Sequence, residues 1–196
     1  MGNIVKINKK DKKLEINYYD FLVYVLLLTT LLVLSHSVRN YYFTVSYIEL
    51  TYSLFLLPFI YFIINLIIKK YDYQGAIKSI SISGIFLVLS VVLVGFFAGN
   101  GFSFDDIYGE FCAYVVSSFV NLTVYYFLLL NTKMPSLLVF LNYIFVLIIY
   151  YFVYMLFSIN TISLEYFWLS YFSTLVIQIF ICCLLTFIDK YVKRGI

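Results

Sequence analysis

The residues of this chain that could take part in chemistry are neutral polar side chains embedded in long apolar stretches. Two groups of three recur at helical spacing, one at i, i+4 and i+8 and one at i, i+3 and i+7, so each group shares one helix face. A polar side chain within a bilayer costs free energy unless it finds a partner, which makes such residues candidates for a transport pathway. The set comprises Asn65, Ser117, Asn121, Tyr125, Asn142, Tyr171, Thr174 and Gln178.

Amides and aromatic rings together suit a flat, hydrogen-bonding heterocycle, because amides pair with its edge while rings stack on its face. The same residues could instead form interhelical hydrogen bonds, worth about 0.6 kcal/mol each, and both interpretations stay open at this stage. On the first interpretation, the substrate contacts are Asn65, Asn121 and Gln178 at the edge, Tyr125 and Tyr171 in stacking, Asn142 and Thr174 in the same polar stripes, and Glu49 or Glu110 at the outer mouth.

No pattern of catalytic or metal-ligating residues accompanies these side chains. The single histidine, His36, stands near the end of an apolar stretch, without a Ser or Cys nucleophile pattern and without carboxylates paired at a defined spacing. The three cysteines, Cys112, Cys182 and Cys183, lack C-x-x-C spacing and are typical of small packing residues. We therefore expect neither an enzyme nor a cofactor, a metal ion or a disulfide.

The elements that must position the polar residues are six membrane-spanning helices. Crossing a hydrocarbon core of roughly 30 Å takes about 20 helical residues, and 64% of the 196 residues are hydrophobic. The apolar stretches predict an all-α membrane bundle with spans at Tyr18 to His36, Ser46 to Ile68, Ser79 to Ala98, Glu110 to Leu130, Leu137 to Phe157 and Glu165 to Ile188.

The basic residues predict how this bundle sits in the membrane. All 13 Lys and Arg residues except Arg39 precede the first span or follow the second, fourth or sixth span, and cationic segments resist translocation out of the cytoplasm. This distribution predicts a basic cytoplasmic segment at 1–17, a six-helix transmembrane domain at 18–188 and a basic cytoplasmic tail at 189–196. The basic residues are too dispersed to form a nucleic-acid footprint, so no nucleic-acid partner is expected.

The order of these features resembles the queuosine precursor transporter family, also called the vitamin uptake transporter family. The resemblance is clearest over Leu54 to Gly84. There the run from Leu56 through Pro58 to Asn65 is similar to the family's apolar-Pro-apolar run ending in Thr-Asp, and a basic loop around Gly75 follows it. Weaker similarity covers two further stretches, which correspond to the family's fourth and closing spans, at Phe111 to Phe127 and Tyr166 to Val192.

The chain departs from the family pattern at three interior positions. Asn65 and Thr123 stand where the family has acidic residues, and Thr174 stands where its last span commonly has Lys. The resemblance implies an importer of a small planar heterocycle, a deazaguanine precursor of queuosine, in the cytoplasmic (inner) membrane.

Two other classes of protein fit the same sequence. One is a non-transporting membrane protein, such as a bacteriocin-immunity or partner-binding protein, and the other is the substrate-binding component of a larger importer. The expected partners are a small-molecule substrate and the lipid bilayer. A homo-oligomer or an energising partner stays open, because the chain has no ATP-binding motif of its own.

Overall fold

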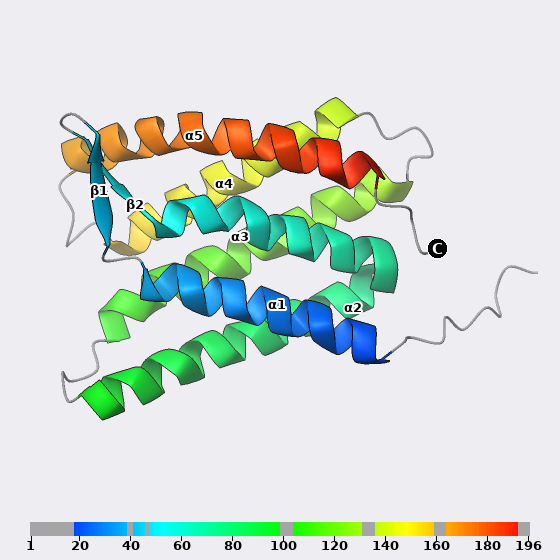
Figure 1. Ribbon diagram of the computed structural model, residues 1–196, viewed down its shortest axis with the longest axis horizontal. Coiled ribbons are helices and arrows are strands. Elements are labelled where there is room, and N and C mark those ends of the chain that lie inside the picture. Colours follow the sequence, from blue (N-terminus) through cyan, green and yellow to red (C-terminus); the bar gives the residue numbers. More distant parts are fainter. Residues whose placement is uncertain are drawn as a thin grey trace, which may run out of the picture.

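The computed structural model of the chain describes residues 18–38, 41–45, 48–98, 104–130, 136–158 and 164–191. In these residues the chain forms five helices, which are α1 Tyr18–Ser37, α2 Ser53–Ala98, α3 Phe104–Leu130, α4 Ser136–Ser158 and α5 Leu164–Tyr191. A short antiparallel hairpin of β1 Tyr42–Val45 and β2 Ile48–Thr51 lies between α1 and α2, at one end of the bundle (Figure 1).

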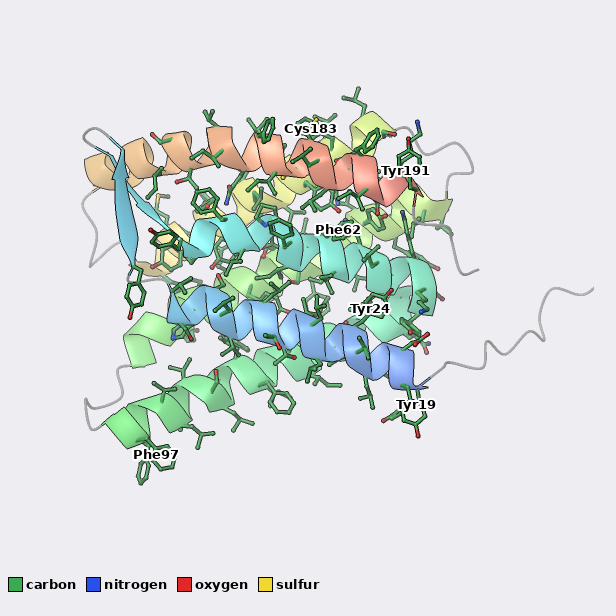
Figure 2. The ribbon with its side chains drawn as sticks, in the orientation of Figure 1. Tyr19, Tyr24, Phe62, Phe97, Cys183 and Tyr191 are labelled. Atoms are coloured by element: carbon green, nitrogen blue, oxygen red, sulfur yellow. The ribbon has the colours of Figure 1, made fainter. Side chains whose placement is uncertain are left out.

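All five helices contain a segment long and apolar enough to cross a membrane. A bilayer interior offers no water to backbone N–H and C=O groups, and a helix satisfies these groups internally. Large apolar side chains cover the outside of the bundle; Phe97, for example, is 81% exposed and projects away from the bundle at one end of α2 (Figure 2). The chain is a multi-pass membrane protein.

The longest helix, α2, is broken at Asp72, whose backbone is non-helical with φ 63° and ψ −176°. At this break the chain reverses direction, so that residues 53–71 and 73–98 form two arms that run in opposite directions (Figure 1). Gly75 supports the reversal, since a Cβ atom added there would lie 2.6 Å from the Cβ of Tyr71. The loop expected between Lys69 and Lys78 is therefore wrong in extent, because a single non-helical residue makes the turn.

The two ends of the bundle differ, and we name them by what they contain. The hairpin end holds the β-hairpin, and the break end holds the reversal of α2 (Figure 1). The first arm of α2, α3 and α5 all run from the hairpin end to the break end, whereas α1, the second arm and α4 run in the opposite sense (Figure 1). The first arm and α3 are thus parallel neighbours, which sets the geometry of the interior.

The sequence located most of the helices closely, with two errors near the hairpin end, one of which is that the fourth span was expected to start at Glu110 whereas α3 begins at Phe104. The second span was expected to start at Ser46, but β2 occupies Ile48–Thr51 and the helix begins at Ser53. At the other end of the chain, α5 continues through Tyr191 and buries Asp189, which had been assigned to the cytoplasmic tail. The expected basic segment at 1–17 lies outside the described residues.

The three amides expected at the edge of a ligand are buried in the interior. Asn65, Asn121 and Gln178 each have no exposed surface, so these three amides point into the bundle. Burial of an amide without hydrogen bonds would cost several kcal/mol in hydrocarbon, so their partners decide what the interior can do.

Candidate functional site

A ladder of paired polar side chains joins the first arm of α2 to α3. Tyr61 and Ser117 share a hydrogen bond of 2.7 Å between their hydroxyl groups, and Asn121 Nδ2 donates to Asn65 Oδ1 at 2.9 Å. Both pairs are separated by 56 positions in the chain. Because the two helices are parallel, each step of four residues advances both sides by about one turn, or about 6 Å.

A third rung follows one turn further toward the break end. It pairs Lys69 with Tyr125, again 56 positions apart, through a shared acceptor, Asp189 of α5. We call these three rungs, built from Tyr61 and Ser117, Asn65 and Asn121, and Lys69 and Tyr125, the polar ladder. It runs through the bundle over about two helical turns.

The middle rung extends into a chain of three amides on three helices. Asn142 Nδ2 of α4 donates to Asn121 Oδ1 at 2.8 Å, and Asn121 in turn donates to Asn65. The three side chains are between 0 and 3% exposed. Two atoms at the ends of the chain, Asn65 Nδ2 and Asn142 Oδ1, have no hydrogen-bond partner among the described residues.

The chain of amides has a property that does not depend on which way each amide is turned. A head-to-tail chain of amides leaves one NH₂ group at one end and one C=O group at the other, and turning all three amides over only exchanges the ends. Tyr143 of α4 faces both Asn65 and Asp189 beside this chain. The interior thus offers a donor, an acceptor and a buried aromatic ring within one layer.

The third rung contains a buried ion pair. Lys69 Nζ lies 2.8 Å from Asp189 Oδ1 and also donates to the backbone oxygen of Asp189 at 2.6 Å, while the two side chains are only 7% and 4% exposed. Tyr125 donates its hydroxyl proton to the same carboxylate, at 2.9 and 3.0 Å from its two oxygens. Such additional hydrogen bonds are what a buried ion pair needs to offset the loss of hydration.

A second ion pair closes the interior at the hairpin end. His36 Nδ1 of α1 lies 2.7 Å from Glu110 Oε2 of α3. The His36 side chain is 20% exposed, whereas that of Glu110 is 3% exposed. Glu110 precedes Ser117 by two helical turns on α3, so the two ion pairs lie on either side of the chain of amides.

The remaining residues predicted from the sequence fall in different places. Gln178 of α5 donates from Nε2 to the Tyr151 hydroxyl of α4 at 2.8 Å, and Thr174, one turn earlier, is buried at 2% exposure. Tyr171 belongs to α5 and Glu49 to β2, but the side chains of both lie outside the described part of the structure.

The structure thus brings together Asn65, Asn121, Asn142 and Tyr125, although Tyr125 uses its hydroxyl group rather than the stacking role that we expected. Glu110 is buried in an ion pair, where an open outer mouth was expected.

Sequence reasoning missed the residues that carry full charge in the interior. Lys69 was assigned to a topogenic loop and Asp189 to the tail, yet both are buried. A signal for Lys69 was present, because Tyr61, Asn65 and Lys69 recur at i, i+4 and i+8, the same spacing that drew attention to Ser117, Asn121 and Tyr125 on α3. Asp189 lies eleven residues, about three helical turns, after Gln178 and so shares its face of α5, but its place beside Lys190 obscured this signal.

Comparisons with known protein families, with curated proteins and with solved structures find no match to this chain. The resemblance to the queuosine precursor transporter family therefore stays a prediction from the sequence.

Proposed function

We propose that this protein transports a small planar heterocycle across the cytoplasmic membrane, and that the chain of amides in the polar ladder binds it. The observation that carries the proposal is the buried chain Asn65, Asn121 and Asn142, which ends on one donor and one acceptor without a partner among the described residues. A buried donor or acceptor without a hydrogen-bond partner destabilises the protein. Hydrogen bonds to a ligand with a complementary edge would offset this cost.

The proposed fold of the transporter has six crossings, with both termini in the cytoplasm. The apolar segment of α2, Phe55–Val94, has 40 residues, about 60 Å of helix and twice the roughly 30 Å core. Its break at Asp72 supports counting two crossings. Lys70, Lys78 and Lys190 lie near the break end, which the positive-inside rule then assigns to the cytoplasm.

The resemblance stated above suggests a deazaguanine base as the substrate. Such a base carries a lactam C=O and N–H beside an amino group on one edge, so it can accept from one amide and donate to another. Buried Tyr143 and Tyr61 beside the amides provide aromatic surface for its faces. The residues themselves support only the general class, a flat ligand with adjacent donors and acceptors.

The two ion pairs suit a transporter that opens one end at a time. His36 with Glu110 holds α1 to α3 at the hairpin end, and Lys69 with Asp189 holds α2 to α5 at the break end. The proposed binding site lies between them. In this scheme a substrate reaches the amides from outside when the first pair separates and leaves to the cytoplasm when the second pair separates.

Uptake of a labelled deazaguanine base tests the proposal, in cells that lack both their own synthesis and other import routes. We expect Asn121→Leu to raise the substrate concentration needed for half-maximal uptake about 5-fold to more than 100-fold, the effect of losing one good buried hydrogen bond. Uptake is expressed per molecule of folded protein, counted by fluorescence-detected size exclusion. No uptake by the wild-type protein would refute the proposed substrate.

Thr123→Leu is the matched control for this experiment. Thr123 lies two positions from Asn121 on the exposed side of α3, and its hydroxyl bonds only to the Phe119 carbonyl of its own helix among the bonds described. Thr123→Leu introduces the same apolar side chain as Asn121→Leu, at a position outside the polar ladder. Unchanged kinetics in Asn121→Leu and Thr123→Leu alike would remove the amides from the site.

One observation favours the non-transporting alternative. The polar groups of the ladder bond directly to one another across helices, as expected for side chains that hold a bundle together. In that case Asn121→Leu should lower the amount of folded protein and leave any uptake per molecule unchanged. A component of a larger importer is distinguished by reconstitution, because the purified chain alone would bind substrate in proteoliposomes without transporting it.

A further inference from the structure

We propose that Glu110 binds a coupling proton, which reaches it from the outer side through His36. This inference rests on the proposed function and adds its energy source, a proton gradient. The observation behind it is the ion pair of 2.7 Å between His36 Nδ1 and Glu110 Oε2 at the hairpin end, in which the imidazole is partly exposed and the carboxylate is buried. Ionisable side chains inside a membrane protein commonly mark ion or proton pathways.

The two buried ion pairs of the described residues differ in one chemical property. The ammonium group of Lys69 is held by both the carboxylate and the backbone oxygen of Asp189, so that pair links α2 to α5 through two contacts. His36 in the pair with Glu110 carries an imidazole, the side chain whose charge ordinarily changes near physiological pH. The chain has a single histidine, and it lies in the pair at the hairpin end.

The exposures of the two partners give the order in which a proton would meet them. The His36 side chain is 20% exposed and the Glu110 side chain 3%, so water at the hairpin end reaches the imidazole first. An imidazole with its proton on Nδ1 donates that proton toward Glu110 and leaves Nε2 free to accept another. Water delivers a proton to Nε2, which makes the ion pair of imidazolium and carboxylate, and the Nδ1 proton then passes to Glu110 Oε2.

The products of this step are a neutral carboxylic acid and a neutral imidazole protonated on Nε2, with one proton gained in all. The charge attraction between the two side chains is then lost and only a hydrogen bond between neutral groups remains, so the link between α1 and α3 at the hairpin end weakens. Reprotonation of Nδ1 from water and loss of the Nε2 proton restore the imidazole. A substrate could enter while Glu110 is neutral, which makes proton and substrate travel together.

Titratable groups of α1, α2 and α4 surround this site in the described part of the chain. His36 faces Glu110 from α1, and Tyr150 faces it from α4; Tyr150 in turn faces Tyr61 of α2 and Tyr151 and Tyr154 of its own helix. Tyr61 and Ser117 form the rung of the polar ladder nearest to Glu110. The proton site therefore adjoins the proposed pathway without belonging to the chain of amides.

Proteoliposomes containing the purified full chain and a pH-sensitive dye in the lumen test this inference. Addition of a labelled deazaguanine base should acidify the lumen as the base enters. The initial rate of uptake should rise as the outside pH falls, by up to about tenfold per pH unit, the limit for one bound proton. Substrate uptake without lumen acidification and without pH dependence would overturn the proton site and leave the proposed function standing.

Variants of the pair give the matched comparison. Glu110→Gln should abolish the acidification and flatten the dependence of uptake on outside pH, whereas Asp20→Asn, which removes an exposed carboxylate at the opposite end of the bundle, should preserve both. If Glu110→Gln fails to fold, the double variant His36→Gln with Glu110→Gln replaces the ion pair by a neutral hydrogen-bonded amide pair. Proton coupling that survives in either folded variant refutes the assignment to Glu110.

Calorimetry of substrate binding supplies a readout that does not need transport. The heat of binding is measured in two buffers of different protonation enthalpy, which gives the number of protons taken up with each bound base. The wild-type protein should take up a proton with the base and Glu110→Gln should not. A base that neither binds nor enters vesicles would refute the proposed function, and the coupling proton with it.

Discussion

At the scale of single residues, Lys69 and Lys70 differ in burial although they are adjacent in the chain. Lys69 pairs with Asp189 where both side chains are almost fully buried, whereas Lys70 pairs with Asp20 at 39% and 47% exposure. Removing one partner of a buried pair leaves an uncompensated charge in a medium of low polarity. An exposed pair contributes little, because water and salt screen it.

We therefore expect Lys69→Met and Asp189→Asn each to destabilise the folded protein by about 3 to 5 kcal/mol. The double variant should recover much of this loss, since it leaves no unpaired charge and keeps an acceptor for the Tyr125 hydroxyl. Thermal unfolding in detergent measures the effect. The matched variants Lys70→Met and Asp20→Asn should each change stability by less than about 1 kcal/mol, and equal losses in the two sets would contradict the role assigned to burial.

The candidate site was only partly predictable at this scale. Asn65, Asn121 and Asn142 stood out because an amide is rare and costly among apolar residues of a membrane helix. Asp189 did not stand out, because it is followed directly by basic residues at the end of the last apolar stretch, where a carboxylate is expected to meet water. Only the packing of α5 against α2 and α3 turns it inward.

At the scale of elements, the β-hairpin is the feature that the sequence concealed, whereas the reversal of α2 was predicted at the right place but with too long a loop. The residues of β1 and β2 include Tyr, Phe, Val, Ile and Thr, which favour strands but also raise the hydropathy of the following span. The turn at Asp72 is shorter than the predicted loop because helical residues continue on both sides of it. The ends of α1, α4 and the last turn of α3, by contrast, lie within a residue of their predicted positions.

Gly75 is expected to be required for the reversal of α2. In Gly75→Ala the new Cβ atom would lie 2.6 Å from the Cβ of Tyr71, which has no freedom to move away without shifting the helix. We expect a loss of stability of about 1 to 3 kcal/mol, typical of overpacking, seen as a lower unfolding temperature in detergent.

Gly84→Ala provides the comparison, since its Cβ would lie 3.3 Å from the Cε2 atom of Phe111, at the far end of a side chain. That change should be milder, because the ring can shift while Ala favours the helix more than Gly does. A Gly75→Ala protein as stable as Gly84→Ala would show that the two arms do not need this close approach.

At the scale of the whole molecule, charge and burial divide the bundle into two unlike ends. The break end holds Asp20, Lys69, Lys70 and Asp189, and the hairpin end holds His36 and Glu110. Toward the middle of the bundle, the polar ladder places buried hydrogen-bonded side chains on consecutive turns of α2 and α3. An orientation in the membrane fixes which of these ends meets the cytoplasm, and hence the direction of the proposed proton step.

Accessibility labelling of single cysteines tests that orientation. Cys112, Cys182 and Cys183 are first replaced by Ala, because all three are free thiols, and one cysteine is then introduced at each of several loop positions. Six crossings with cytoplasmic termini predict that cysteines near Lys10, Lys70 and Lys133 react with a membrane-impermeant maleimide only after the cells are opened. Cysteines near Asn100 and Asn160 should react in intact cells.

If the chain crosses the membrane five times, the two ends of α2 lie on opposite sides of it. Comparing cysteines near Tyr52 and near Asn100 therefore distinguishes five crossings from six. Both should label from outside if α2 crosses twice, because its two arms return to the hairpin end (Figure 1). Labelling of only one of them in intact cells would show that α2 crosses once. A cysteine near Lys70 that labels in intact cells would invert or abolish the six-crossing arrangement, and the outer side assigned to His36 would fall with it.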